Sequence, residues 1–600
     1  MTDVFIDGVF IGTIKDGTKF VNDITAARRN DKISKFVNAI YNEITDRVII
    51  MFCKNRLRRP LIVVENGKAT LTDDLQKQLE EGTLKWSDLV KKGVIEELDA
   101  LEEESAFIAL NEDEITKEHT HVEVNPLAIF GVNTSLVPYA NFNQSSRLNR
   151  GQKTQKQSCA CYAKNFLNRL DTNVNIIHYP QTPLVRSYTQ DIFGNLITSG
   201  QNVVIAVLQY EGYNMDDGIV LNKASVDRGF GRITHYRPYS AEKLRYAGGQ
   251  IDKICVPDKD VQSYTIEEDY RFLDEDGLIN PEVDVKGGEV IIGKISPPRF
   301  LSRLESFSAA ANISKDTSVR VKFGEHGTIS KVLLTESEDG NPLIKLEVRE
   351  TRPPQIGDKF SSRHGQKGVI GLVADTENMP FTASGIQPDL VFSPFGMRRM
   401  TVSHIIEALG AKLGAMAGRY VYGTPFDSEK PEDLRKELLS LGFIDDGTET
   451  LYDGRTGQEY KARVFVGNIF YMRLKHHVMD KLQARGRGRV ALLTRQPTAG
   501  KAVEGGLRFG EMEKETLVGH GAALLMKERF DSDKTIEYVC DRCGDLATYD
   551  YYQDKVMCLT CGDKVKASPI EMSYAFKLFL DELKSMNMRP RLILKDKFSQ

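Results

Sequence analysis

Four cysteines near the end of the sequence have the spacing of a metal site. Cys540 and Cys543 form one CxxC pair, and Cys558 and Cys561 form a second pair after an interval of 14 residues. Each pair can reach one ion from a tight turn, and four thiolates complete the tetrahedral shell that zinc prefers, with no position open for substrate. The sequence therefore predicts one structural zinc ion, and the symmetrical pairs disfavour the alternative of two redox-active CxxC motifs.

A glycine-rich segment with three cations has the residue types of a phosphate site. Residues 357–371 carry Lys359, Arg363 and Lys367 among small residues. Glycine allows close approach of a phosphate or sugar backbone, lysine supplies a point charge, and arginine can form a bidentate pair. The segment lacks the GxxxxGK(S/T) pattern of a P-loop. By itself it would also fit an ordinary solvated surface loop.

Two further segments repeat this combination of small polar residues and cations. Residues 143–157 can contact phosphate and sugar without reading base sequence. Arg398 and Arg399 come just before a helix predicted from its apolar spacing, with Thr401 as its N-cap. Because the positive end of a helix is a natural anion site, both arginines are candidate phosphate contacts.

A third basic segment is expected to be helical. A helix over residues 471–485 would place His477, Lys481 and Arg485 on one side, beside an apolar stripe. A polyanion could bind along this basic stripe. A solvated surface is the alternative interpretation.

Asp216 and Asp217 are the acidic candidates, and they follow the apolar run VVIAVLQY. Adjacent carboxylates at the end of a buried strand can hold Mg²⁺. A turn with two solvated acids is the alternative. Neighbouring residues of a strand point in different directions, so the pair does not make a complete two-metal site, and nothing else in the sequence completes one.

These segments need several folded modules to position them. Six hundred residues exceed what one hydrophobic core usually serves, and 41% hydrophobic with 27% charged residues is the composition of a globular protein. No stretch approaches the roughly 18 apolar residues of a membrane span, and the first residues lack the pattern of a secretion signal. Eight cysteines are too few for a disulfide scaffold, which predicts a reducing, cytoplasmic compartment.

The predicted fold class is a multidomain α+β protein with a β-rich insert and a C-terminal zinc ribbon. Apolar patterns predict helices near residues 31–48, 513–530 and 569–586. Residues 230–350 show short strand patterns between Gly, Asp and Pro turns, which predicts the β-rich insert. The acidic run at 96–104 is expected on an exposed face. The net charge of −4 is small because acidic regions such as this one and the basic segments largely cancel.

Long segments across the sequence match the motifs of one protein family. They are NQSSR…QKTQKQ, GYNMDDGIVLNKASVDRG, GDKFSSRHGQKGVIG, FSPFGMRRMTVSHIIE, DKLQARGRG, LTRQPTAGKAVEGGLRFGEMEKE and the paired CxxC motifs. In these segments the chain resembles the second-largest subunit of multisubunit DNA-directed RNA polymerases, in the archaeal and eukaryotic form. The segments follow one another in the family's order, whereas residues 1–125 agree more loosely.

The resemblance implies a role for each matching residue. The implied catalytic residues are Lys359, Lys367, Arg147, Arg399, Asp217 and Asp216. The lysines would face the RNA 3′ end and the incoming nucleotide, the arginines would contact the triphosphate, and the acids would lie near the Mg²⁺ that the nucleotide carries. The implied nucleic-acid contacts are Gln144, Lys156, Gln157, Arg363, His476, Lys481, Arg485 and Arg508.

The resemblance also implies a division of the chain into domains. The expected domains are an external-type mixed α/β region (1–125), a hybrid-binding region in two parts (126–229 and 351–508), a wall-like β-rich insert (230–350), an anchor-like helix (509–531) and a clamp-type zinc ribbon with a C-terminal helix (532–600).

The sequence departs from the family pattern in two respects. Many relatives carry Glu at the position of Asp216 and Ser at the position of Gly218, which leaves the metal contact of the acidic pair open. The chain also begins where the family's sequence is about half finished, as in archaeal lineages whose subunit is encoded as two polypeptides. The loop that chelates the permanent catalytic Mg²⁺ belongs to the family's largest subunit.

We therefore expect a subunit of a DNA-directed RNA polymerase, a nucleotidyltransferase that is inactive as an isolated chain. The expected partners are the N-terminal half as a separate chain, the largest subunit, other polymerase subunits, template DNA, the RNA–DNA hybrid and nucleoside triphosphate, and no membrane. The expected cofactors are zinc and, mainly held by the largest subunit, Mg²⁺. A zinc-ribbon scaffold without polymerase chemistry and a self-sufficient nucleotidyltransferase are the alternatives. The four retained cations argue against the first alternative, and the missing chelating loop argues against the second.

Overall fold

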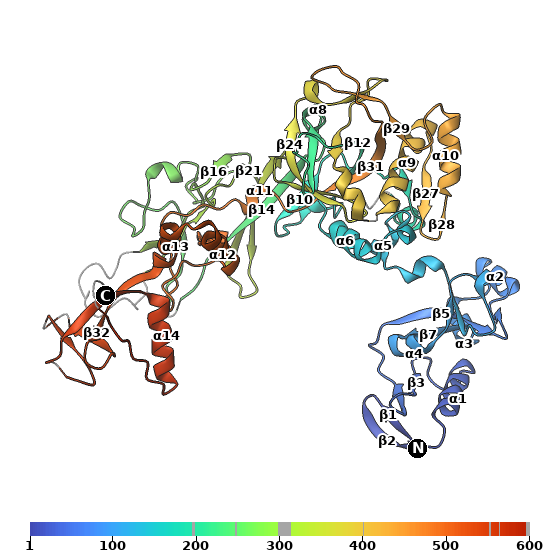
Figure 1. Ribbon diagram of the computed structural model, residues 1–600, viewed down its shortest axis with the longest axis horizontal. Coiled ribbons are helices and arrows are strands. Elements are labelled where there is room, and N and C mark those ends of the chain that lie inside the picture. Colours follow the sequence, from blue (N-terminus) through green and yellow to red (C-terminus); the bar gives the residue numbers. More distant parts are fainter. Residues whose placement is uncertain are drawn as a thin grey trace. The chain divides into compact units, whose positions relative to one another are not determined.

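The chain folds into two compact units, Met1–His477 and Val478–Gln600, which are described separately. The computed structural model (Figure 1) describes residues 1–194, 198–246, 249–297, 314–399, 401–550, 552, 554–562 and 564–595. Within these ranges, no helix combines the length and the apolar character that crossing a bilayer requires.

The first unit begins with two small sheets. The strands of the first sheet, in the order β2-β1-β4-β3, are β1 (Thr2–Ile6), β2 (Val9–Ile14), β3 (Asn38–Asn42) and β4 (Arg47–Met51), and α1 (Gly17–Arg29) packs against them. The strands of the second sheet are β5 (Arg58–Glu65), β6 (Lys68–Ala69), β7 (Ile95–Asp99), β8 (Ile108–Ala109) and β9 (His121–Glu123), accompanied by α2 (Asp73–Glu80), α3 (Trp86–Lys91) and α4 (Ala100–Ser105).

The helix expected near residues 31–48 is wrong. The helix in this region is α1, which Asp16 caps by accepting a hydrogen bond from the N–H of Lys19, and residues 38–51 form the hairpin of β3 and β4. The left-handed φ of 47° at Asp46 makes the turn of that hairpin. The apolar residues after it alternate between buried and half-buried positions, which is the periodicity of a strand and not of a helix.

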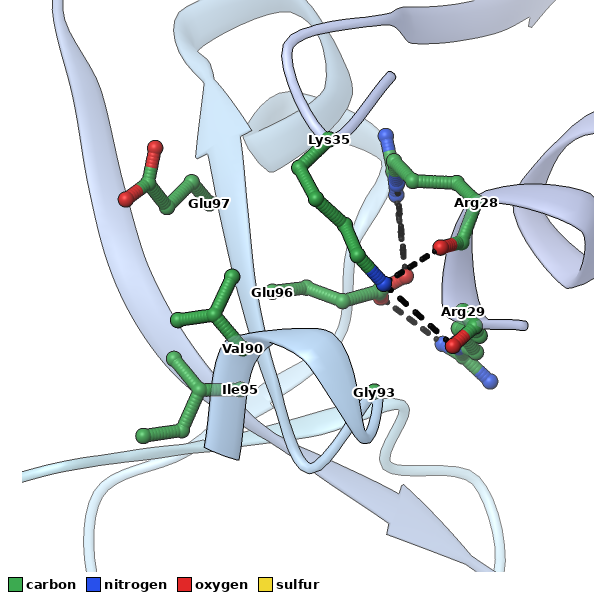
Figure 2. Close-up of a pocket in the computed structure, with 8 residues that line it drawn as sticks. All are labelled: Arg28, Arg29, Lys35, Val90, Gly93, Ile95, Glu96 and Glu97. Atoms are coloured by element: carbon green, nitrogen blue, oxygen red, sulfur yellow. Dashed lines mark hydrogen bonds and ion pairs between the residues drawn. The ribbon is translucent and has the colours of Figure 1, made fainter. Parts of the chain in front are cut away.

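The acidic run at 96–104 is not fully exposed, contrary to expectation. Glu96 is 4% exposed and accepts hydrogen bonds from Arg28 at 3.1 Å, Arg29 at 2.9 Å and His121 at 3.0 Å. Figure 2 shows Arg28 and Arg29 bonded to this carboxylate at the wall of a small cavity, while the ammonium of Lys35 donates to the main-chain carbonyl oxygens of the two arginines. Residues distant in sequence thus neutralise the charge of Glu96. Counting the charged residues within 96–104 could not reveal these partners.

The Glu96 cluster predicts an acid-sensitive N-terminal region. Burial raises the pKa of Glu96, but hydrogen bonds from His121 and Arg29 and the charges of both arginines outweigh burial and hold the pKa well below its ordinary value of 4.5. A carboxyl with a lowered folded-state pKa contributes stability that is complete above its ordinary pKa and is lost as pH falls below it. Hydrogen exchange of residues 95–99 should therefore accelerate as pH falls below 4.5, after correction for the intrinsic rate.

Replacement of Glu96 should reproduce this loss at neutral pH. Glu96→Gln removes a buried counterion that the buried Arg28 shares with the partly exposed Arg29, and Arg28 then keeps only Glu102 as an acidic partner, which should cost up to about 3 kcal/mol of local stability. Glu104→Gln is the control because Glu104 is exposed on the same acidic run. Equal exchange in the two variants would contradict the importance of this cluster.

A closed β-barrel forms the centre of the first unit. Its sheet has the strand order β12-β26-β13-β24-β23-β31-β29, and β12 also pairs with β31, which closes the ring. The strands are β12 (Gln201–Val207), β13 (Gly218–Asn222), β23 (Lys359–Ser362), β24 (Lys367–Ala374), β26 (Leu390–Phe392), β29 (Thr448–Glu449) and β31 (Val464–Arg473). Residues from six of these strands pack together in one core, including Ile205, Ile219, Phe360, Ile370 and Ile469.

Two helices cover part of this barrel. α9 (Val402–Ala417) lies along β31, and α10 (Pro431–Ser440) packs on α9 (Figure 1). The close contact of α9 with β31 uses Gly467, because a Cβ atom there would lie 2.9 Å from the carbonyl oxygen of Ala408. The barrel therefore has one side held rigidly by helical packing.

The predicted β-rich insert is confirmed in the described parts of residues 230–350; residues 247, 248 and 298–313 lie outside the described residues. Its main sheet has the strand order β10-β14-β22-β21-β16. The strands are β10 (Val174–Ile177), β14 (Ile233–Glu242), β16 (Asp284–Lys286), β21 (His326–Glu336) and β22 (Pro342–Arg352). β14 and β22 pair over ten residues, and the aliphatic residues between the strands form a separate core.

The second unit contains short helices and an antiparallel ribbon. The helices are α11 (Val478–Lys481), α12 (Glu511–His520), α13 (Ala523–Phe530) and α14 (Tyr574–Ser585). The ribbon has the order β34-β33-β32-β35, with β32 (Lys534–Cys540), β33 (Leu546–Asp550), β34 (Lys555–Met557) and β35 (Ala567–Ser573).

Three helix predictions for this part of the chain need correction. The helix over 471–485 is wrong, because residues 464–473 are the barrel strand β31 and only Val478–Lys481 is helical. The expected helix near 513–530 is two helices, separated at Gly521, whose φ of 79° is left-handed. The last helix begins at Tyr574, after Ser573 accepts a hydrogen bond from the N–H of Phe576.

Candidate functional site

The hairpin of β23 and β24 places two lysines on one face of the barrel wall. Ser361 pairs with Lys367, and Lys359 pairs with Val369, so these four residues share a face. Phe360 points into the barrel core from the opposite face. Lys359 and Lys367 are thus diagonal neighbours, for which the typical Cα separation is about 7–8 Å.

The turn of this hairpin lies directly against α6 (Ser145–Lys156), the helix that carries Arg147. A Cβ atom on Gly365 would lie 2.7 Å from the carbonyl oxygen of Arg147, and one on Gly151 would lie 2.5 Å from that of Arg363. Gly365 also has a left-handed φ of 73°. The helix and the turn therefore make backbone contact that no larger residue would permit.

Arg147 lies in the first turn of α6 with a polar atom that has no partner. Its Nη1 atom is buried and makes no hydrogen bond among the described residues. Burial lowers the pKa of Arg147, as do the charges of Arg150 and Arg399, while Asp217 acts in the opposite direction. A partly exposed guanidinium that has one buried, unpartnered nitrogen and lies beside another cation is suited to receive an anion.

The same hairpin turn fixes the segment that carries Arg399. Gln366 donates from Nε2 to the carbonyl oxygen of Gly396 at 3.1 Å and to Oγ1 of Thr401 at 2.5 Å. Thr401 occupies the N-cap position of α9, as predicted, although its hydroxyl does not cap the helix. Arg399 forms an ion pair with Asp217.

Asp217 is attached to the same hairpin by a main-chain hydrogen bond. Its carbonyl oxygen accepts a hydrogen bond from the N–H of Val369 at 3.0 Å, at the start of the β13–β24 pairing. Contacts through one hairpin therefore bring together the segments that carry Arg147, Lys359, Lys367 and Arg399, and we call these four residues the cation cluster, with the turn of Asp217 beside them.

The two acids occupy a turn and not a strand. Asp216 and Asp217 have left-handed φ values of 48° and 69°, which is uncommon for two consecutive residues other than glycine. The buried Asn214 holds the turn, because its side chain accepts from the N–H of Tyr210 and donates to the carbonyl of Leu208. Such backbone strain is concentrated at functional sites.

A buried carboxylate holds the hairpin turn between the two lysines of the cation cluster. Glu407 of α9 is 1% exposed; its Oε1 accepts from Nη2 of Arg363 at 2.6 Å, and its other oxygen bonds to His364. The N–H of Phe470 in β31 also donates to Glu407, and Ser403 bonds to the second ring nitrogen of His364. Glu407 thus joins α9, β31 and the hairpin turn.

This network does not fit the prediction that Arg363 contacts nucleic acid. Arg363 is 3% exposed, donates to Glu407 and to the carbonyl oxygen of Val185, and lies over the ring of Phe470. Although its Nε and Nη1 atoms have no hydrogen-bond partner among the described residues, a guanidinium this buried cannot reach a phosphate without leaving its counterion. Its role in this structure is to hold the turn in place.

Sequence reasoning did not assign a role to Gln366 or Glu407. A usable signal was present for Glu407, because it is an acid within the otherwise apolar segment IIEALG, and a buried acid requires a cationic partner. Gln366 carried no such signal, since amides in glycine-rich turns are common. Its two acceptors become visible only when the segment around Arg399 is placed beside the turn.

The remaining predicted nucleic-acid contacts lie in different environments. Gln144 and Lys156 are exposed at the two ends of α6, and Gln157 bonds through its Oε1 to His476 at 3.0 Å. His477 is buried, so the predicted basic stripe does not form. In the second unit, Lys481 and Arg508 are exposed, while Arg485 donates to the carbonyl oxygens of Glu504 and Arg489.

The four cysteines of the predicted metal site come together in the second unit. Their sulfur atoms all lie within 4.8 Å of one another. A tetrahedral site with Zn–S bonds of about 2.3 Å requires sulfur separations of about 3.8 Å, so the donor set could hold a zinc ion. Backbone N–H groups of Cys543 and Arg542 help to lower the pKa of Cys540 to about 7, which favours the thiolate.

Sequence comparison identifies the class to which this barrel and ribbon belong. The family description RNA polymerase Rpb2, domain 6 matches residues 133–503, and domain 7 matches residues 505–595. Domains 4 and 5 of the same family match residues 4–65 and 86–131. The chain therefore belongs to the Rpb2 family of second-largest RNA polymerase subunits.

Individual relatives agree with this assignment over nearly the whole chain. DNA-directed RNA polymerase subunit Rpo2 of Sulfolobus acidocaldarius is 45% identical over 99% of the chain, which covers 53% of that protein. DNA-directed RNA polymerase II subunit RPB2 of Encephalitozoon cuniculi is 38% identical over 98% of the chain, which covers 53% of that protein. The chain spans about half the length of the curated relatives it matches.

The Glu407 network predicts a large response to loss of one charge. Glu407→Gln keeps the shape but leaves Arg363 buried without a counterion, which should cost about 3–5 kcal/mol. Amide exchange over residues 359–369 should accelerate. Glu432→Gln, an exposed acid of α10, should change stability by no more than about 0.5 kcal/mol. Unchanged exchange in the hairpin of Glu407→Gln would show that the turn does not need this support.

Proposed function

We propose that the chain is the part of a DNA-directed RNA polymerase subunit that positions the nucleoside triphosphate and the RNA 3′ end. The observation that carries this proposal is the cation cluster, in which one hairpin gathers positive charges from three segments distant in sequence. The names of the relatives, which are DNA-directed RNA polymerase subunits, support the same function.

The cation cluster would act by positioning and by neutralising charge. Phosphoryl transfer spreads negative charge over the oxygens of the transferred group, and fixed cations stabilise that charge without reorganising. Lys359 and Lys367 would face the RNA 3′ end and the triphosphate, and Arg147 and Arg399 would contact the phosphates. The Nη1 atom of Arg147 has an unused donor available for this purpose.

Magnesium would be supplied mainly by another subunit. When bound, the ion neutralises the triphosphate and activates the attacking hydroxyl. Among the described residues, no third potential ligand joins Asp216 and Asp217 in a metal-holding group. Two adjacent carboxylates suit an auxiliary contact to the metal that the nucleotide carries, and the largest subunit would hold the permanent ion.

The other parts of the chain would bind nucleic acid and partner subunits. Gln144, Lys156 and Gln157 would follow the RNA strand, Lys481, Arg485 and Arg508 would lie near the template strand or its surroundings, and His476 would contact nucleic acid. The β-rich insert is proposed as the wall that turns the hybrid, and residues 532–600 as part of the clamp. A separate chain matching the N-terminal half of the curated relatives and the largest subunit are the proposed principal partners.

Lys367→Ala tests the proposed role of the cation cluster. Lys367 is exposed at the start of β24, so its loss should leave the fold and assembly intact. Nucleotide addition by the assembled enzyme should slow by more than tenfold, because one fixed positive charge on the transition state is removed. Lys430→Ala, at the N-cap position of α10, is the control. Normal elongation by Lys367→Ala would refute the assigned role.

Two measurements separate this proposal from its alternatives. RNA synthesis by the isolated chain would indicate a self-sufficient nucleotidyltransferase. Failure to co-purify with a polypeptide matching the N-terminal half of the curated relatives would favour a zinc-ribbon scaffold that has lost polymerase chemistry.

We also propose that the cysteine cluster holds one structural zinc ion. Metal analysis of the purified chain should find one zinc per chain, and Cys543→Ser should lower this content because it removes one of four ligands. Cys53→Ser is the control, since Cys53 is exposed and outside the cluster. Equal zinc contents in the two variants would exclude the cluster as the site.

A further inference from the structure

The segment that follows α14 returns to the cysteine ribbon. The helix ends at Ser585, and Asn587 turns the chain with a left-handed φ of 62°. The N–H of Leu592 then donates to the carbonyl oxygen of Gly544 at 2.8 Å, just after the first CxxC pair. A Cβ atom on Gly544 would lie 2.7 Å from the carbonyl oxygen of Leu592. Residues 586–592 therefore pack directly on the first cysteine turn.

Arg589 in this segment contacts both cysteine turns at once. Its Nε and Nη2 atoms donate to Oδ2 of Asp545 at 3.0 and 2.6 Å, and Nη2 also donates to Oγ1 of Thr560 at 3.1 Å. Asp545 follows the first CxxC pair, and Thr560 lies inside the second. The Thr560 hydroxyl also donates to Asp545 at 3.2 Å, which closes a network across the two turns.

The position of this guanidinium suits a four-thiolate site. Four thiolates around one Zn²⁺ leave an excess of negative charge, which a nearby cation stabilises. The hydrogen bond with Asp545 is the main cause that raises the pKa of Arg589, and Cys543 and Cys561 contribute in the same direction. The guanidinium is held beside the ligand-bearing turns by its hydrogen bonds, since Asp545 is two residues after Cys543 and Thr560 directly precedes Cys561.

We propose that Arg589 and residues 586–592 form a clasp that holds the two cysteine turns together around the metal. Separation of the turns would break the Asp545–Arg589–Thr560 network. Conversely, without the metal the thiolates repel one another, which destabilises the spacing of the two turns that the hydrogen bonds of Arg589 require. Metal binding and docking of this C-terminal segment would then be one cooperative event. The inference rests on the proposed zinc site and is independent of polymerase activity.

Arg589 is a positioning residue, because it contacts neighbours of the ligands and not the metal. Its side chain is 45% exposed, so its ion pair with Asp545 adds little stability by Coulomb attraction alone. The effect should therefore appear in the lifetime of the bound metal and not in the overall stability of the chain.

Zinc release from the full-length chain tests the clasp. The rate would be measured with an excess of a chromogenic chelator. Loss of a residue that orients metal ligands typically weakens metal binding about 10–100-fold, so Arg589→Ala should release zinc faster by a factor of that order. Arg589→Lys should be intermediate, because lysine keeps the charge but cannot form the planar fork. Arg591→Ala, which removes an exposed arginine of the same segment, should match the wild type.

A second measurement needs no variant. Zinc removal from the wild-type chain should accelerate amide exchange over residues 586–595, with the N–H of Leu592 most affected. Release from Arg589→Ala at the wild-type rate, or unchanged exchange after zinc removal, would overturn the clasp alone. A wild-type chain that takes up no zinc would overturn the metal site and the clasp together.

Discussion

The cation cluster depends on a single buried negative charge. Glu407 lies in the only helix that runs along barrel strand β31 in the described part of the chain, and its carboxylate binds both Arg363 and His364. Burial of that carboxylate is tolerable because Arg363 supplies a positive charge and His364 a hydrogen bond, and the buried guanidinium of Arg363 has Glu407 as its counterion. The turn between the two lysines therefore has one stable position. The segments that carry Arg147, Asp217 and Arg399 are positioned by their contacts with this hairpin.

The closed barrel explains why distant segments can converge on this turn. Strand β12 pairs with both β26 and β31, so the sheet has no free edge at that point, and each strand end is held on two sides. The segments carrying Arg147, Asp217 and Arg399 leave the barrel wall or its helices beside the same hairpin. A cluster of like charges is costly to assemble, and a rigid closed sheet is a scaffold that can bear this repulsion.

The sequence predicts the parts of the molecule whose signals are local. The paired CxxC motifs, the strand-rich residues 230–350 and the helix after Thr401 were all legible from spacing and turn residues. The helix expected over 471–485 failed because its first three residues end strand β31 and only Val478–Lys481 is helical, so the i, i+4 spacing of its residues did not belong to one continuous helix. The burial of Glu96 and Arg363 was equally hidden, since their partners are 25 or more positions away in sequence.

The reciprocal glycine contact between α6 and the hairpin has a mechanical consequence. Gly151 and Gly365 meet main chain against main chain, where there is no side chain that could change rotamer to absorb a displacement. A movement of either element towards the other must therefore displace the other by a similar distance, because the two backbones are already in contact. The distance between the charged groups of Arg147 and the barrel lysines can therefore change only through rotation of these long side chains, because their backbone positions are fixed.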